Sequence, residues 1–96
     1  MTELKDRPGV WAEERAAAYS QGVRCGHLDA SQRVKRGEYL TTGEAESDAF
    51  EAVEAQTTLP DYCKRSWRDG YVVGYRTAFS GKSVPEEYRL MTDKSA

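Results

Sequence analysis

The sequence predicts an all-α protein, a small three-helix bundle with a short fourth helix at the C-terminus. Stretches rich in helix-forming residues are separated by start and stop signals near Gly37, Thr41, Thr58 and Gly81. Apolar residues recur within these stretches at spacings of three and four, the period of one helical face. No segment alternates polar and apolar residues for long enough to indicate a strand.

The first helix is expected over residues 10–36. Pro8 suits an entry turn, and Gly37 suits a left-handed exit cap. A break near Gly26 is an alternative, because glycines weaken the middle of the stretch. The expected packing face consists of Ala12, Ala16, Tyr19, Val23, Gly26 and Ala30.

Thr41 and Glu44 have the spacing of a capping box and indicate the start of the second helix. Its inward side is expected to consist of Ala45, Ala49, Ala52, Val53 and Gln56, with Phe50 at its edge.

The third helix is expected to begin with Thr58 as its cap and to end at Gly81 in a left-handed cap. Ser83 and Glu86 repeat the start signal, which predicts the short fourth helix over 83–91.

A weak internal repeat links the first and third helices. Tyr19 to Ala30 and Trp67 to Ala78 both read aromatic-x-x-Gly-x-x-x-Gly-x-x-x-Ala. A glycine inside a helix costs about 1 kcal/mol relative to alanine, so two in each helix need a structural reason. Close crossing of the two helices is the best explanation. The glycines assigned to helix packing are Gly22, Gly26, Gly70 and Gly74.

Length and composition predict one small domain over 1–96, with flexible ends at 1–9 and 92–96. Large aliphatic residues are few, so alanine and the aromatic residues are expected to form the core. The N-terminus is polar and no apolar run reaches the length of a signal peptide or membrane span, so we expect a cytoplasmic protein with no membrane partner and reduced thiols.

Motifs for chemistry are absent. The Ser-Gly-Lys-Ser run at 80–83 matches only the end of a phosphate-binding loop, and Arg76 stands where the first glycine should be. Cys25 and His27 lie two residues apart and would point away from each other on a helix, with Cys63 distant in sequence. We therefore predict no enzymatic activity, no cofactor, and no catalytic or metal-binding residue.

Charge is segregated along the chain. Residues 1–36 carry a formal charge of +2, residues 37–63 carry −7 and residues 64–96 carry +3. The acids of the middle helix either pair with arginines of the neighbouring helices or form a face for a basic partner, and the sequence leaves both interpretations open. The acids predicted to contact such a partner are Glu46, Asp48, Glu51 and Glu54.

Aromatic residues and arginines are interleaved in the third helix. Tyr, Trp and Arg dominate the binding energy of many interfaces, and they also stack on unpaired RNA bases. Whether Trp67, Tyr71, Tyr75 and Phe79 form core or interface stays open. The residues of this helix predicted to contact a partner are Arg65, Trp67, Arg68 and Tyr71.

Two elements of the chain resemble the ribosome modulation factor family. The residues that carry the resemblance are Arg15, Ala16, Gly22, Gly26, Pro60, Tyr62, Arg65, Ser66, Trp67, Gly70, Tyr71 and Ala78. That family comprises small bacterial proteins, with relatives in phages, that bind ribosomal RNA and help to inactivate ribosomes in stationary phase. Unlike its founding members, this chain is net acidic and carries an acidic helix between the two elements.

These observations predict a small non-catalytic binding protein of bacterial or phage origin. The leading hypothesis is an inhibitor or adaptor that engages a host protein, itself basic or nucleic-acid-binding, through the acidic helix and the aromatic-arginine helix. The alternative, implied by the family resemblance, is a modulator that associates with the ribosome or with RNA. The sequence also leaves a homodimer open.

Overall fold

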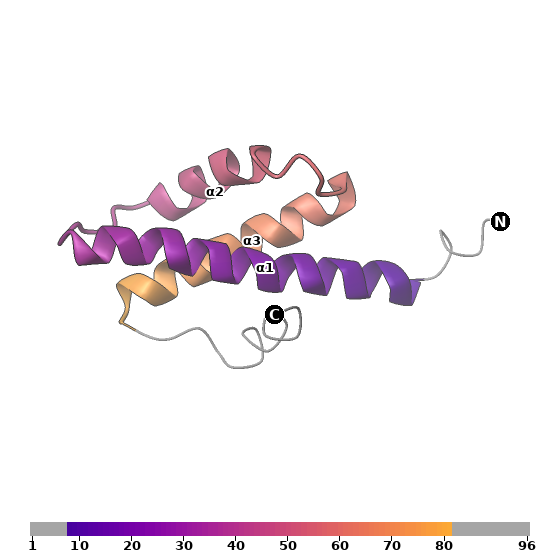
Figure 1. The fold of residues 1–96 in the computed structure, drawn as a ribbon, viewed down its shortest axis with the longest axis horizontal. Helices are drawn as coiled ribbons and strands as arrows, with labels where there is room; N and C mark the ends of the chain where they lie inside the picture. Colours follow the sequence, from indigo (N-terminus) through magenta and orange to yellow (C-terminus); the bar gives the residue numbers. More distant parts are fainter. Residues whose placement is uncertain (1–7, 82–96) are drawn as a thin grey trace.

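The computed structural model describes residues 8–81, which form three helices (Figure 1). α1 spans Pro8–Lys35, α2 spans Glu44–Glu54 and α3 spans Asp61–Phe79. α1 and α3 run in the same direction, and α2 returns antiparallel to both. Within this range there is no strand, so the all-α class is confirmed for it. The fourth helix predicted over 83–91 lies outside the described residues, and so do the flexible ends predicted at 1–9 and 92–96, except for residues 8 and 9, which begin α1.

The three helices do not contact one another equally. α1 and α3 share by far the largest interface, whereas α2 packs on α3 and barely contacts α1. The fold is therefore a tight parallel pair with a third helix laid on α3. This asymmetry leaves a groove between α1 and α2.

The helix ends follow local sequence signals at the C-terminal side. α1 continues without a break through Gly26 and stops in front of Gly37, whose φ of 78° is left-handed. The Glu38 N–H donates to the Arg33 carbonyl at 3.1 Å, and the Gly37 N–H donates to the Val34 carbonyl at 3.0 Å. This pair of bonds is a Schellman motif. The predicted exit cap is confirmed, and the alternative of a mid-helix break is wrong.

α2 and α3 begin later than their sequence signals suggest, whereas α1 begins at Pro8, two residues before its expected start. The residue capping α2 is Gly43 and not Thr41, although the backbone N–H and hydroxyl of Thr41 still donate to Glu44 Oε1, at 3.1 and 2.9 Å. The residue capping α3 is Pro60 and not Thr58. Both predicted starts are wrong for the same reason. The backbone of Gly43 and of Pro60 turns the chain into the helix, and neither helix has a side-chain cap.

The close contact between α1 and α3 is made by the glycines of the repeat. A Cβ added to Gly22 would lie 2.9 Å from the Trp67 carbonyl carbon, and one added to Gly70 would lie 2.9 Å from that of Tyr19. The two contacts are equivalent, because Gly22 and Gly70 occupy the same position in the two copies of the repeat, and so do Tyr19 and Trp67. The only side chain small enough for this backbone approach is the single hydrogen of glycine.

The second pair of glycines repeats this arrangement one turn further along. Gly26 lies against the Tyr71 carbonyl, and Gly74 lies against the Val23 carbonyl. Each repeat copy thus presents its glycines to the other copy's backbone, which gives the pair an internal pseudo-two-fold symmetry. The Cα–H groups of the glycines face carbonyl oxygens, a contact that adds weak stabilisation at helix crossings.

The core is an aromatic ladder along α3. The rings of Trp67 and Tyr71 are 5.3 Å apart, those of Tyr71 and Tyr75 are 5.7 Å apart, and those of Tyr75 and Phe79 are 5.6 Å apart. Small residues of α1 and α2 close around the ladder. The buried alanines and valines of those two helices are Ala18, Val23, Ala30, Ala45, Ala49 and Val53.

Two residues of the predicted packing face of α1 are exposed. Ala12 and Ala16 lie in the first turns of α1, among residues that contact the start of α3. There the contact is made by larger side chains, because the Trp11 ring stacks on that of Tyr62 at 5.3 Å and Arg15 Nε donates to the Tyr62 carbonyl at 3.4 Å. Periodicity identifies a face of a helix but not which side chains of that face the partner helix covers.

Both cysteines are free thiols, and burial raises the pKa of each. We expect a Cys25→Ser, Cys63→Ala variant to remain folded. Its melting temperature should be modestly lower than that of the wild type, because Cys63 is buried and its replacement removes packed atoms. Thermal unfolding of the wild type followed by circular dichroism should be the same with and without reductant. Loss of helicity when reductant is added would show instead that a disulfide stabilises the fold.

Candidate interaction surface

The predicted contact residues of α3 divide into buried and exposed members. Trp67 is 1% exposed and Tyr71 is 3% exposed, so both belong to the core. Their side chains offer no surface to a partner, which corrects the expectation that they form part of a binding patch. The spacing of Trp67 and Tyr71 did not show whether they are buried or exposed. They lie on one i, i+4 ridge with Tyr75 and Phe79, and a ridge of aromatic residues can face either the core or a partner.

Phe50 of α2 is one of the exposed aromatic residues of the described chain, together with Tyr39 and Tyr62. Phe50 is 57% exposed, and the Arg68 guanidinium lies 4.3 Å from its ring centroid. A cation over an aromatic face is held by the ring quadrupole, worth about 0.5–1 kcal/mol at an exposed site. Arg65, one turn before Arg68 on α3, is exposed. Sequence reasoning placed Phe50 at the edge of the packing face and did not identify it as a contact residue.

The acids of α2 fall into two groups. At its N-terminal half, Glu44 pairs with Arg33 at 2.9 Å, Glu46 pairs with Arg76, and Asp48 accepts a hydrogen bond of 2.6 Å from the Tyr75 hydroxyl. At its C-terminal half, Glu51 and Glu54 are exposed and make no hydrogen bond or ion pair with any residue of 8–81. Internal pairing therefore accounts for the first half of the helix only.

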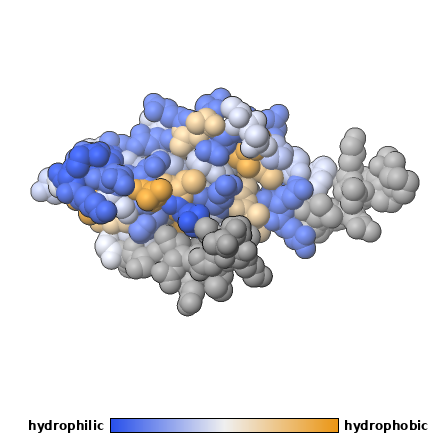
Figure 2. Space-filling view, in the orientation of Figure 1, coloured by the Kyte–Doolittle hydropathy of each residue, from blue (hydrophilic) through white to orange (hydrophobic). Residues whose placement is uncertain are grey.

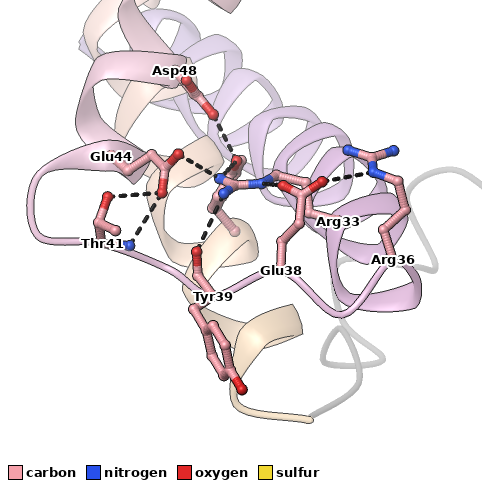
Figure 3. A network of polar contacts seen from close by, with 8 residues as sticks. Arg33, Arg36, Glu38, Tyr39, Thr41, Glu44 and Asp48 are labelled. Atoms are coloured by element: carbon pink, nitrogen blue, oxygen red, sulfur yellow. Dashed lines mark hydrogen bonds and ion pairs between the residues drawn. The ribbon is translucent and has the colours of Figure 1, made fainter.

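Arg33 is the centre of a polar network that sequence reasoning missed (Figure 3). Its guanidinium donates to Glu38 Oε1 at 2.7 Å, to the Tyr75 hydroxyl at 2.7 Å and to the Tyr39 carbonyl at 3.2 Å, besides the Glu44 pair. These partners come from the α1–α2 loop, α2 and α3. No local spacing announces such a site, because its members are brought together only by the fold.

The network lowers the pKa of two carboxylates. Arg36 and then Arg33 lower the pKa of Glu38, and the Thr41 N–H followed by Arg33 lowers the pKa of Glu44. Burial, followed by the bond to Asp48, raises the pKa of Tyr75, which therefore stays a protonated donor at neutral pH.

A groove of about 430 Å³ lies between α1 and α2 above the aromatic ladder. Asp29 and Arg33 line its α1 wall, Asp48 and Glu51 line its α2 wall, and Tyr71 and Tyr75 line its floor. Figure 2 shows that the described part of the face viewed there is largely hydrophilic, with small apolar areas separated by polar residues. Nothing in that view resembles one large apolar patch.

Residues 8–81 contain no group of three or more side chains that would hold a metal ion. None of the three helices described is long and apolar enough to cross a membrane. His27, the single histidine, lies partly buried on α1. Comparison of the chain with protein-family models, with curated proteins and with solved structures finds no match.

Proposed function

We propose that the protein is a small non-catalytic binding protein, an inhibitor or adaptor, that engages a basic protein partner through the outer edge of α2. We call this the α2 edge and define it as Phe50, Glu51 and Glu54, with Arg65 and Arg68 beside it on α3. The observation that carries the proposal is the division of the α2 acids. Those of the first half are engaged inside the fold, whereas Glu51 and Glu54, which follow the exposed Phe50 on α2, have no described partner.

An exposed aromatic ring next to free carboxylates suits recognition of a basic surface. Buried aromatic anchors supply much of the binding energy of an interface, and surrounding charges steer the encounter and select the partner. The Arg68 guanidinium already restricts the Phe50 side chain, so binding of a partner to this ring costs little further side-chain entropy.

The alternative, an RNA- or ribosome-associated modulator, is less well supported by the geometry. RNA-stacking platforms need exposed aromatic faces, and the Trp67 and Tyr71 rings are in the core. The two unpaired carboxylates of Glu51 and Glu54 would also repel a phosphate backbone.

The proposal is tested by capture from a bacterial lysate on the immobilised full chain. A Phe50→Ala, Glu54→Gln variant should retain less than about a tenth of the captured partner, because it loses both the anchor and a steering charge. The matched control is Leu28→Ala, Glu13→Gln, which removes an exposed apolar side chain and an exposed acid from α1. That control should capture as much partner as the wild type.

Treatment with ribonuclease and with salt separates the two functions. Partner capture through the α2 edge should survive ribonuclease and weaken as salt rises. If ribonuclease releases the bound material, the RNA-associated function replaces the proposed one. Equal loss of capture in the test variant and in its control would also contradict the α2 edge as the binding surface.

A further inference from the structure

The groove between α1 and α2 has carboxylates on opposite walls, each held by a tyrosine of the floor. The Tyr71 hydroxyl donates to Asp29 Oδ2 at 2.5 Å, and the Tyr75 hydroxyl donates to Asp48 Oδ2 at 2.6 Å. Both tyrosines are largely buried and lie one turn apart on α3, so they hold the two aspartates at fixed positions across the groove. In each aspartate Oδ1 makes no bond within the described chain and is left to accept from a ligand.

The groove carries net negative charge. Its lining holds three carboxylates, Asp29, Asp48 and Glu51, and one cation, Arg33, which is also bonded to Tyr75, Glu38 and Glu44. An excess of negative charge in a groove favours a cation. The acids are too dispersed to form a metal site within residues 8–81, so an organic cation fits the groove better than a metal ion.

Among organic cations a guanidinium matches this geometry best. It is planar and has five N–H donors in a fixed fork, so it can bond carboxylates on two walls at once. An ammonium is a compact point charge without that planar fork. The volume of about 430 Å³ lies within the range of roughly 300–1,000 Å³ of small-ligand sites, enough for one such side chain with its stem.

We propose that this groove receives an arginine side chain from a basic protein segment, an inference that rests on the proposed function and names the chemistry of its partner. Glu51 belongs both to the groove and to the α2 edge, so one partner can contact the two surfaces together. The arginine bonds Asp29 on one side and Asp48 or Glu51 on the other. Phe50 receives an apolar part of the same segment.

The test uses the full chain and a synthetic tetra-arginine peptide, titrated by calorimetry at low salt. An Asp29→Asn, Asp48→Asn variant keeps an acceptor oxygen for each tyrosine hydroxyl but removes both charges, and circular dichroism checks that it is folded. We expect this variant to bind the peptide at least tenfold more weakly. The matched control, Asp61→Asn, Asp69→Asn, removes the same two charges from exposed positions of α3 outside the groove and should bind within about twofold of the wild type.

Three results would overturn the inference. Equal weakening in both variants would show general charge attraction without a site. Equal affinity for a tetra-lysine peptide would remove the guanidinium assignment. Tighter binding of spermidine than of the arginine peptide, with the same variant dependence, would assign the groove to a small polycation.

The failure of this inference is distinguishable from that of the proposed function. If lysate capture depends on Phe50 and Glu54 while peptide binding ignores Asp29 and Asp48, the α2 edge stands and the groove assignment fails. If the peptide binds in the groove but the Phe50 variant captures as the wild type does, the α2 edge fails.

Discussion

Replacing Gly74 with leucine is expected to destabilise the protein strongly. A side chain at this position would lie within 3 Å of the Val23 carbonyl carbon and the His27 nitrogen, both of which are backbone atoms that cannot rotate away. α1 and α3 would have to separate, and overpacking of this kind costs about 1–3 kcal/mol or more. For a domain of this size each kcal/mol corresponds to about 4–8 °C in melting temperature.

The smaller change Gly74→Ala should also destabilise. Alanine improves helix propensity by about 1 kcal/mol, but even its Cβ meets the Val23 backbone. The matched control is Val73→Leu, which adds apolar bulk to the neighbouring, partly exposed residue and should change stability by no more than about 0.5 kcal/mol. Thermal unfolding followed by circular dichroism measures all three. A Gly74→Leu protein as stable as the wild type would contradict the close crossing.

Features that depend on local backbone chemistry could be predicted from the sequence. The positive φ angles of Gly37 and Gly81 follow from glycine placed at the end of a helical period, and the repeat pointed to the two helices that share the largest interface. The predicted caps of α2 and α3 lie two residues before the observed ones, Gly43 and Pro60, because an N-cap can be made by backbone geometry as well as by a threonine side chain.

The candidate site was predicted only in part. Glu51, Glu54 and Arg65 are exposed as a contact residue must be, but nothing in the spacing showed that Glu46 and Asp48 would bond to Arg76 and Tyr75. Those pairings depend on which face of α3 is covered by α2. A one-dimensional pattern does not contain that information, and neither does it contain the groove that α2 leaves beside α1.

Removal of Arg33 should give the largest loss of stability among the charged residues of the described chain. Its guanidinium joins α1, the following loop, α2 and α3, and it also lies over the rings of Tyr75 and Phe79, at 5.9 and 5.4 Å from their centroids. We expect Arg33→Ala to lower the melting temperature by several degrees. Arg33→Lys should lose most of the same stability, because lysine keeps the charge but not the planar fork. The control, Arg36→Lys, affects an exposed residue that bonds Glu38 alone and should be nearly neutral.

The same network should make stability depend on pH in the acid range. The pKa values of Glu38 and Glu44 are lowered in the folded protein relative to an ordinary value near 4.5, so their contribution is complete above that value and is lost as the pH falls through the lower, folded pKa values. Because Arg33 is one cause of both shifts, Arg33→Lys should raise the midpoint of acid unfolding relative to the wild type. Circular dichroism between about pH 2 and 6 measures the two midpoints. Identical midpoints would show that Arg36 and the Thr41 N–H hold these carboxylates ionised without help from Arg33, and that the stability contributed by Arg33 comes from Tyr75 and the aromatic rings alone.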